Sequence, residues 1–204
     1  MNRGLFGFLG PVQPRSHSLR DVQRAVKDGV STPRLRLRPP ALADLPHIRR
    51  YAVREAFYRY MDMEKPTPEG IGKYLESAMA TWRRRRPAEL VFAIEPGDVG
   101  RIVGLIRIRI DEDDDRAASV GFHLDSDFQG RGYATEALRE IVRIGFAHSG
   151  VARIWAEVDT RNTQSCALLE RAGFRREKRM DGHRSIRGTV TDWYLYAVDR
   201  PRSR

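Results

Sequence analysis

The sequence predicts an α/β domain in which short strands alternate with amphipathic helices, and two neighbouring segments carry that prediction. Residues 118–124 form a short stretch in which apolar and polar side chains alternate, a pattern typical of a strand. Over residues 134–146, apolar side chains recur at three- and four-residue steps, which is typical of a helix. A turn containing Gly130 and Gly132 joins the two segments.

Length and composition fit a single globular domain. The chain has 204 residues, of which 41% are hydrophobic and 31% charged, and this is enough apolar material for a packed core. No apolar run approaches the length that a membrane-spanning helix needs. The only cysteine, Cys166, excludes an intramolecular disulfide and fits a reducing compartment, so we expect a cytoplasmic protein.

The first 31 residues are expected to be an extension, and residues 32–204 to form the domain. The segment before Asp21 contains no acidic residue. A mobile tail or a partner-binding arm is the leading interpretation, with an organellar transit peptide as the alternative. Within the extension, residues 19–30 have the spacing of an amphipathic helix.

The next segment predicts one strand and two helices. Residues 35–38 alternate and form the first strand, which prolines then end. Helical spacing follows over residues 44–60 and 67–85. The arginine run at 83–86 closes the second helix, where the helix dipole favours cations. Contact with RNA phosphates or with an acidic substrate is the alternative role of this run.

The remaining elements follow from the same two periodicities. The acidic run at 111–115 is predicted to be a solvated hairpin loop, because nothing there fixes oxygen ligands for a metal. Strands are expected over residues 89–94, 101–110, 152–158, 174–179 and 189–198, a short helix over 162–172, and a loop over 181–188.

The turn between residues 118–124 and 134–146 has a chemical use. The first N–H groups of a helix lack intrahelical partners, and the helix dipole adds partial positive charge. Glycine lets the backbone come close to a ligand. The N–H groups of residues 130–134 therefore form a candidate cradle for phosphate oxygens, with Arg131 as an added cation. A glycine-rich turn without a ligand is the alternative.

The same stretch resembles a known family. Gln129, Gly132 and Ala134 match the Q/R-x-x-G-x-G/A signature of the GNAT superfamily of N-acetyltransferases. Asn-Thr-Gln-Ser at 162–165, followed by Ala-Gly-Phe at 172–174, resembles the subgroup that acetylates the N-terminal alanine or serine of ribosomal proteins. The resemblance covers roughly residues 32–199 and implies a three-layer fold, with a central, mixed but mostly antiparallel sheet of about seven strands flanked by helices.

The resemblance implies acetyl-CoA as the acetyl donor, an amine as the acceptor, and no metal. The backbone of the strand before the loop would polarise the thioester carbonyl, and Gly121 is compatible with a local bulge there. The expected cofactor-binding residues are Phe122, Leu124, Gln129, Gly130, Arg131, Gly132, Tyr133, Ala134 and Asn162. The expected acceptor-binding residues are Phe57, Tyr58 and Tyr60, with plain aromatic packing as the alternative.

Proton transfer is where this chain departs from many relatives. Leu169 stands where many GNAT enzymes have a tyrosine that protonates the departing thiolate, so Ser165 is the candidate acid, with an ordinary first-turn helix serine as the alternative. Ser119 stands where many relatives have a glutamate base. The candidate bases are therefore His123 and Glu157, ahead of Asp192 and Tyr194, and water is a further option.

The acceptor stays open between several classes. A protein or peptide N-terminal amine, such as that of a ribosomal protein, is favoured over a small-molecule amine such as an antibiotic or a polyamine. Lys and Arg exceed Asp and Glu by 37 − 27 = 10, which is typical of a protein near RNA and equally of an arginine-rich proteome. The sequence is also compatible with a non-catalytic acyl-CoA-binding module and with an RNA-associated protein. The chain is expected to be a monomer or a homodimer.

Overall fold

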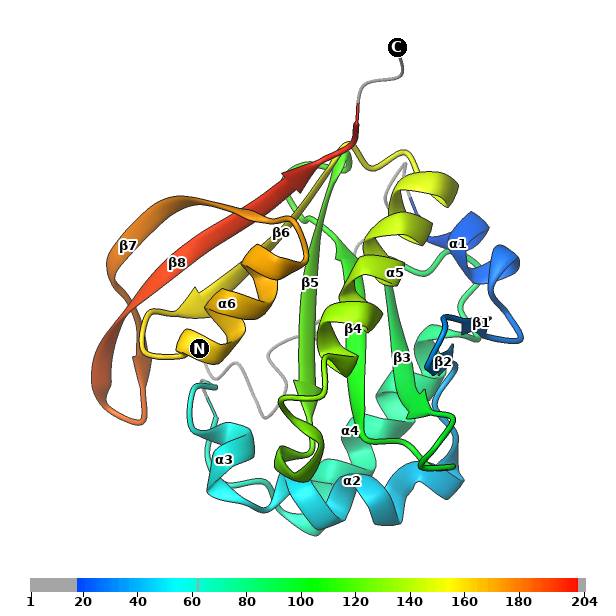
Figure 1. The fold of residues 1–204 in the computed structure, drawn as a ribbon, viewed down its shortest axis with the longest axis horizontal. Coiled ribbons are helices and arrows are strands. Elements are labelled where there is room, and N and C mark those ends of the chain that lie inside the picture. The colour runs from blue at the N-terminus through cyan, green and yellow to red at the C-terminus, as the bar shows by residue number, and fades with distance from the viewer. Residues whose placement is uncertain (1–17, 62, 202–204) are drawn as a thin grey trace.

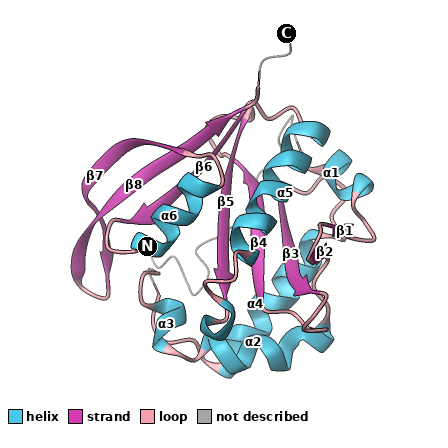
Figure 2. Cartoon of the chain, viewed as in Figure 1, coloured by secondary structure: helices cyan, strands magenta, loops and turns pink. Residues whose placement is uncertain are grey.

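The structure is a computed structural model that describes residues 18–61 and 63–201 (Figure 1, Figure 2). Its strands are β1 (Val30–Ser31), β2 (Leu35–Arg38), β3 (Glu89–Pro96), β4 (Gly104–Ile110), β5 (Ala117–Leu124), β6 (Arg153–Asp159), β7 (Arg175–Ile186) and β8 (Thr189–Asp199). Its α-helices are α1 (Arg20–Ala25), α2 (Leu45–Ala52), α3 (Glu55–Tyr58), α4 (Pro68–Thr81), α5 (Tyr133–His148) and α6 (Thr163–Arg171), and single 3-10 turns cover Leu42–Asp44 and Ser126–Phe128.

All these strands form one sheet of eight, in the order β1-β2-β3-β4-β5-β6-β8-β7. Each neighbouring pair is antiparallel except β5 and β6, which run parallel. The predicted mixed, mostly antiparallel sheet is confirmed. It has one strand more than expected, because Val30–Ser31 also pairs with β2.

Helices cover both faces of the sheet and give the molecule three layers (Figure 1). The side chains of β3 show this directly, since successive residues of a strand point to opposite faces. Leu90 and Phe92 belong to the core cluster beneath α5, whereas Val91 and Ala93 belong to the cluster beneath α2 and α4. Because both faces are buried, β3 reads as a nearly continuous apolar run.

The two halves of the sheet separate between β5 and β6. Their pairing extends only from Ala117 to Ser119 on β5 and from Arg153 to Trp155 on β6. Beyond these residues the strands diverge, and β6 continues with β8 and β7 (Figure 1). The edge of β5 from Val120 to Leu124 therefore has no described strand beside it on the side of β6, and its backbone groups are available to a ligand.

The domain begins before residue 32, which corrects the expected boundary. Leu19, Val22 and Val26 are buried in the main core cluster, and the Leu19 N–H donates to the Pro87 carbonyl at 2.7 Å. The segment is thus packed like the rest of the domain. The remainder of the expected extension, residues 1–17, lies outside the described residues.

Several expected elements have different bounds. The helix predicted over residues 67–85 spans Pro68–Thr81 and ends before the arginine run. The helix predicted over residues 44–60 is split, because Arg54 takes an extended conformation and separates α2 from α3. The loop predicted over residues 181–188 is wrong: β7 continues to Ile186 and pairs with β8 across a tight turn in which Arg187 and Gly188 both have positive φ, 47° and 79°. This long hairpin reaches α3, as described below.

Candidate active site

The glycine turn has the backbone conformation expected of an anion cradle. Gly130 and Gly132 have φ values of 76° and 81°, in the left-handed region that favours glycine. Gly132 is the N-cap of α5. The Glu136 N–H is the first of the helix to find a backbone acceptor, the Gly132 carbonyl at 3.0 Å. The N–H groups of residues 130–135 donate to no other described residue, so they are free to bind phosphate oxygens.

A clasp from the N-terminal part of the chain holds this turn in place. Glu136 accepts hydrogen bonds from the Thr32 hydroxyl at 2.6 Å and from the Arg34 N–H and Nε at 3.0 and 2.7 Å. Arg34 also donates from Nη1 to the Arg131 carbonyl at 2.9 Å. Burial of Glu136 acts to raise its pKa, but the hydrogen bonds from Thr32 and Arg34 outweigh burial and lower it. Glu136 therefore stays ionised and ties the first turn of α5 to the loop before β2.

Some residues expected to bind the cofactor have side chains that point elsewhere. Tyr133 is buried, and its hydroxyl donates to the Asp98 carboxylate at 3.0 Å. Ala134 is buried too. Only the backbone of these two residues belongs to the turn. Gln129 and Arg131 are exposed beside it, as expected for side chains that meet a ligand.

The turn carries a second cation that sequence reasoning missed. The guanidinium carbons of Arg101 and Arg131 lie 4.9 and 5.0 Å from the centre of the Phe128 ring. Both distances are within the range of a cation–π interaction. Arg101 comes from the connection between β3 and β4, which has no sequence motif, so only the fold brings it to the turn.

The pairing of β4 with β5 contains no bulge at Gly121, although a glycine there is compatible with one. The register between β4 and β5 is continuous from Ile110 opposite Ala118 to Gly104 opposite Leu124. Gly121 instead leaves room for an arginine, because a Cβ atom there would lie 3.0 Å from Nε of Arg107. Phe122 and Leu124 are half-buried on the strand edge that the divergence of β6 leaves open.

The start of α6 places Asn162 and Ser165 together. The Asn162 side chain caps the helix and accepts the Ser165 N–H at 3.1 Å. Asn162, which was expected to bind the cofactor, thus acts as an ordinary N-cap, and this contact occupies its side-chain oxygen. The Ser165 hydroxyl is half-buried and has no hydrogen-bond partner among the described residues, so it is free to serve a ligand.

The environment of His123 argues against its role as a base. Its Nδ1 lies 3.3 Å from the Tyr51 hydroxyl, and the edge of its ring meets Phe57 at a centroid distance of 4.8 Å. Burial lowers the pKa of His123 to about 3. The imidazole is then neutral at physiological pH but accepts a proton only weakly. The structural role, which was the alternative for this residue, fits these contacts better.

Glu157 lies farther along β6 and is engaged by basic neighbours. Its carboxylate pairs with the Arg184 guanidinium and lies 3.3 Å from Nε2 of His183, both on β7. As a base it would first have to exchange these contacts. Asp192 is also engaged: a hydrogen bond from the Gly182 N–H is the main cause that lowers its pKa, and Arg179 adds to it. Glu157 and Asp192 are therefore both held by basic or N–H neighbours rather than free to take a proton from an amine.

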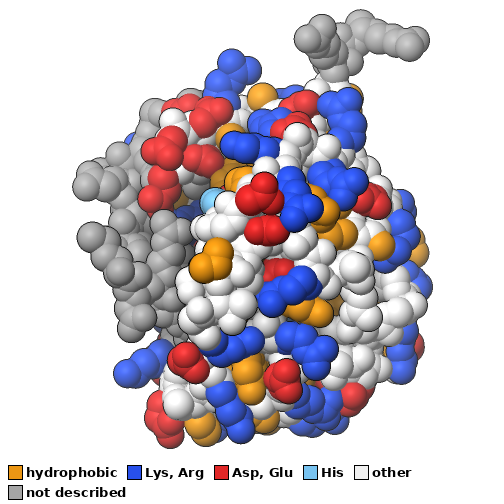
Figure 3. Space-filling view, turned by 90° about the vertical axis from the view of Figure 1, so that its left-hand side faces the viewer, with side chains coloured by type: hydrophobic (Ala, Val, Ile, Leu, Met, Phe, Trp, Pro, Cys, Tyr) orange, Lys and Arg blue, Asp and Glu red, His pale blue; other side chains and the backbone are white. Residues whose placement is uncertain are grey.

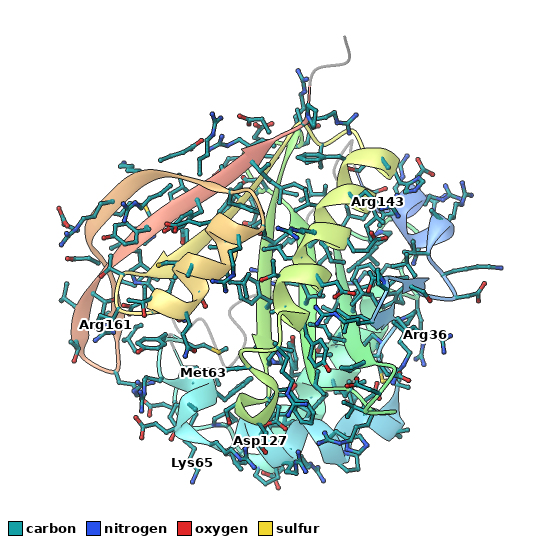
Figure 4. The ribbon with its side chains drawn as sticks, viewed as in Figure 1. Arg36, Met63, Lys65, Asp127, Arg143 and Arg161 are labelled. Atoms are coloured by element: carbon teal, nitrogen blue, oxygen red, sulfur yellow. The ribbon has the colours of Figure 1, made fainter. Side chains whose placement is uncertain are left out.

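The expected acceptor aromatics have different surroundings in the structure. Phe57 is buried against His123, whereas the rings of Tyr58 and Tyr60 are half-buried and contact arginines. The Arg187 guanidinium lies 5.6 Å from the Tyr58 ring, and that of Arg161 lies 6.0 Å from the Tyr60 ring. Figure 4 shows Arg161 and Met63 at the same end of the molecule, where α6 begins.

Arg187 ties the β7–β8 hairpin to the chain around α3. From the hairpin turn, its guanidinium donates to the carbonyls of Tyr58, Arg59 and Met63 at 3.1, 2.9 and 3.2 Å. We call this set of contacts the hairpin latch. It joins the β7–β8 hairpin to the segment that carries the expected acceptor residues.

A buried charged pair lies on the sheet face beneath α4, and sequence reasoning missed it. Glu89 and Arg107 are 3% and 9% exposed, with 4.0 Å between Glu89 Oε2 and Arg107 Nη1. Burial raises the pKa of Glu89 and lowers that of Arg107 to about 10. Arg107 also donates to the Ser119 hydroxyl at 3.3 Å. Two charged residues within apolar strands, on positions that share a face, are the signal that was available.

Two further findings concern membrane-spanning helices and metal sites in the described part of the chain. None of the described helices is long and apolar enough to cross a membrane. Within residues 18–61 and 63–201, His, Cys, Asp and Glu side chains form no cluster that could hold a metal ion.

Comparisons with known proteins agree with this geometry. The model of the acetyltransferase (GNAT) domain family matches residues 34–175. Among curated proteins of Bacillus subtilis, "Uncharacterized N-acetyltransferase YoaA" is 30% identical over 111 residues, which are 54% of this chain and 63% of YoaA. YdaF, provisionally named a ribosomal N-acetyltransferase, is 27% identical over 133 residues, which are 64% of this chain and 72% of YdaF. The chain thus spans under two thirds of YoaA.

Solved structures show the same fold. An acetyltransferase of the GNAT family from Bacillus anthracis has a TM-score of 0.75 at 21% identity, over 84% of this chain and 98% of that one. RimJ of Mycobacterium smegmatis, in complex with CoA-disulfide, has a TM-score of 0.71 at 26% identity, over 85% and 84% of the two chains. The predicted three-layer fold is confirmed by these matches.

The described residues fit acetyl-CoA, the acetyl donor that enzymes of this fold use. The free N–H groups of residues 130–135 suit its pyrophosphate, and the open edge of β5 suits the extended arm that carries its thioester. With the cradle in place at the start of α5, and a family model that matches most of its length, this chain belongs to the GNAT acetyltransferase family.

Proposed function

We propose that the protein is an acetyl-CoA-dependent N-acetyltransferase that moves an acetyl group directly to the N-terminal amine of a peptide or protein. The observation that carries the proposal is the coincidence of two features. The N–H groups of residues 130–135 are free, and the edge of β5 next to them is open because β6 diverges. Together they suit a donor whose phosphates sit at the turn and whose acyl group lies along the strand.

On the donor side, the chain supplies backbone donors. The N–H groups of residues 130–134 hold the pyrophosphate, with Arg131 and Gln129 at its edge. A backbone N–H of Phe122 or Leu124 then stabilises the charge that develops on the thioester oxygen. The donor brings an activated acetyl group, so no acyl-enzyme is required. Asn162 fixes the start of α6, which carries Ser165.

On the proton side, the Ser165 hydroxyl gives its proton to the departing thiolate and regains the one that the attacking nitrogen loses, through water. The attacking amine must arrive neutral, and neither His123 nor Glu157 is set up as a strong base. An N-terminal amine has an ordinary pKa of about 7.7–8.0, against about 10.4 for a lysine-like amine. A large fraction of N-terminal amines is therefore neutral near pH 7.5, so a site without a strong base suits them.

Charge at the site favours the same acceptor. Arg187 lies beside the expected acceptor residues, and among the described residues its guanidinium bonds carbonyl groups and no carboxylate, so its charge is not neutralised there. It repels a polyamine, which carries several positive charges, and attracts a peptide with acidic residues. The provisional name of YdaF and a similar solved structure of a ribosomal L7/L12 alpha-N-protein acetyltransferase point to the same class.

A small-molecule amine is the second candidate. A similar solved structure is a spermidine N-acetyltransferase from Vibrio cholerae with CoA and spermine. Glu157 and Glu89 are the carboxylates that would then meet a cationic substrate. Because Glu157 is already paired with Arg184, this candidate ranks second.

The test has two steps. The first measures the melting temperature with acetyl-CoA, with CoA, and without ligand, since a ligand that binds the folded state raises it. The second measures thiol release with a peptide that has a free N-terminal serine or alanine, and with spermidine. The matched control is the same peptide with a blocked N-terminus and an internal lysine.

We expect a rise in melting temperature and thiol release with the free peptide alone, increasing as pH rises toward 8. Equal release with the blocked peptide, or release with spermidine only, would reject the N-terminal acceptor. A rise in melting temperature without release from any amine would favour a non-catalytic acyl-CoA-binding module. No rise at millimolar ligand would reject the cradle.

A further inference from the structure

A cluster of arginines lies on the side of the molecule that carries α1, away from the glycine turn. It combines Arg20 and Arg24 of α1 with residues 83–86, which follow α4; we call these six residues the arginine surface. Contacts join the two segments: the Gln23 side chain donates to the Trp82 and Arg84 carbonyls at 2.6 and 3.2 Å. The six charges are therefore held on one rigid part of the fold.

Ion pairs neutralise little of this charge, although Arg84 interacts electrostatically with the buried Glu89. Among the described residues, Arg20 and the four arginines of residues 83–86 form no ion pair, and Arg24 has only a 3.8 Å contact with Asp21. A depression of about 620 Å³ opens here; Arg20, Arg24, Arg86 and His148 are among its lining residues, and Asp21 is the only carboxylate among them. The face that carries β7 is different, because basic and acidic side chains are intermingled there (Figure 3).

Capping of α4 does not explain the arginine run. The helix ends at Thr81, and its last turn contains no basic residue. Residues 83–86 come after that end, and all four are exposed. A favourable interaction with the helix dipole falls off within the last turn. The side chains are thus left free to bind an external anion.

The chemistry of the surface selects the anion. Guanidinium groups bind phosphate oxygens through paired hydrogen bonds. A membrane surface also needs apolar side chains that insert, but the exposed large hydrophobic residues of the described chain are Leu42, Val53 and Val190, none of them on this surface. Single-stranded nucleic acid needs exposed aromatic rings. Trp82 cannot serve, because it is half-buried and its Nε1 donates to the Val91 carbonyl at 2.7 Å.

We propose that the arginine surface binds the phosphate backbone of a double-helical nucleic acid without reading its bases. The contact is separate from the glycine turn, so it would hold the enzyme on a nucleic acid while the acetyl-transfer site stays open. This inference does not depend on the proposed acetyl transfer.

The test is fluorescence polarisation with a labelled RNA hairpin of about 20 base pairs, at salt concentrations from 50 to 200 mM. Arg85→Gln combined with Arg86→Gln removes two charges from the arginine surface. Arg49→Gln combined with Lys73→Gln removes two exposed charges from α2 and α4 and is the matched control. Arg20→Gln combined with Arg24→Gln tests the α1 side of the surface independently.

For the Arg85 and Arg86 variant we expect binding weakened by about fivefold or more, and a slope of log affinity against log salt reduced by about one for each lost phosphate contact. Hairpins of different base sequence should bind alike. The control should keep the wild-type slope. Thiol release should be unchanged in all these variants, which separates this result from the fate of the proposed function.

Three outcomes would overturn the proposal. An equal loss in the control would mean that the net charge of +10 attracts any polyanion. Binding to vesicles that contain phosphatidylserine, with the same dependence on Arg85 and Arg86, would identify a membrane surface instead. No binding of the hairpin at 50 mM salt would leave the surface without this partner.

Discussion

Gly132 combines backbone conformation and space at the point where α5 begins. Its φ of 81° is strained for any residue with a side chain, and a Cβ atom there would lie 3.2 Å from the Arg34 guanidinium. We expect Gly132→Ala to lower the free energy of unfolding by about 1–2 kcal/mol and to weaken acetyl-CoA binding about tenfold, since the turn must shift. Calorimetric titration with acetyl-CoA measures the second effect.

Gly173→Ala is the matched control for that change. Gly173 has a φ of 95° with open space around its Cβ position, and it follows α6. The substitution should cost similar stability and leave acetyl-CoA affinity intact. If both variants bind acetyl-CoA as tightly as the wild type does, the glycine turn is not the cradle.

Ser165 allows the chemical role to be tested apart from folding, because its backbone N–H has a partner among the described residues and its hydroxyl has none. The N–H bonds to Asn162, and this bond survives in Ser165→Ala. We expect kcat to fall by roughly a hundredfold if the hydroxyl protonates the thiolate. The melting temperature and the Kd of acetyl-CoA should stay at their wild-type values in Ser165→Ala. The control is Thr163→Ala, which removes an exposed hydroxyl two residues earlier on α6. It should leave kcat, the melting temperature and the Kd of acetyl-CoA unchanged. An unchanged kcat in Ser165→Ala would assign Ser165 a structural role.

At the scale of elements, the hairpin latch joins two segments that lie far apart in the sequence. Arg187 bonds three carbonyls of the chain around α3, although it stands at positive φ, where glycine is favoured. Arg187→Gly removes the guanidinium and relieves the backbone strain together. We therefore expect little change in melting temperature but an increase in the KM of the peptide acceptor of about tenfold, with the Kd of acetyl-CoA unchanged.

Gly188→Ala is the complementary variant. It strains the same turn, because Gly188 has a φ of 79°, but keeps the Arg187 guanidinium. It should lower the melting temperature and leave the acceptor KM close to the wild-type value. A peptide KM that is the same in Arg187→Gly and in the wild type would show that the latch does not position the acceptor.

Most elements could be predicted from the sequence because their signals are local. The periodicities of β5 and α5 lie within the segments themselves. The second half of β7 failed for the opposite reason. Gly182 and polar neighbours look like a loop, and only pairing with β8 makes them a strand.

The residues of the site also divide into those with local sequence signals and those whose roles depend on distant contacts. The glycine turn was found because its function depends on backbone conformation within one stretch. The pairing of Glu157 with Arg184 joins strands distant in the chain. The burial of His123 depends on Tyr51 and Phe57, which come from helices on the other side of a long connection. Roles that depend on such contacts could not be predicted from periodicity.

At the scale of the molecule, the N-terminal segment from Leu19 onward belongs to the core. Leu19 is 0% exposed, whereas Leu42, outside the core, is 62% exposed. We expect Leu19→Ala to lower the free energy of unfolding by about 2–5 kcal/mol and Leu42→Ala to change it by about 0.5 kcal/mol or less. Urea unfolding measures both. Equal effects of the two substitutions would restore the segment to the status of an extension.

The stability of the whole molecule should also depend on pH through His123. Its pKa is about 3 in the folded protein, because burial disfavours the imidazolium, and about 6.5 in the unfolded chain. Above pH 6.5 both states are neutral at this residue and it contributes no pH dependence. Between pH 6.5 and 3 only the unfolded state binds the proton, so acidification favours unfolding by up to about 1.4 kcal/mol for each pH unit.

The pH slope of stability isolates this contribution, because carboxylates contribute to it in every variant. Urea unfolding between pH 7 and 4.5 should show a shallower loss of stability in His123→Gln than in the wild type, whatever the substitution costs at pH 7. His148→Gln, at an exposed histidine near the end of α5, should keep the wild-type slope. If His123→Gln also keeps that slope, His123 titrates in the folded protein as it does in the unfolded chain. The imidazole would then be solvated and would regain its place as a candidate base.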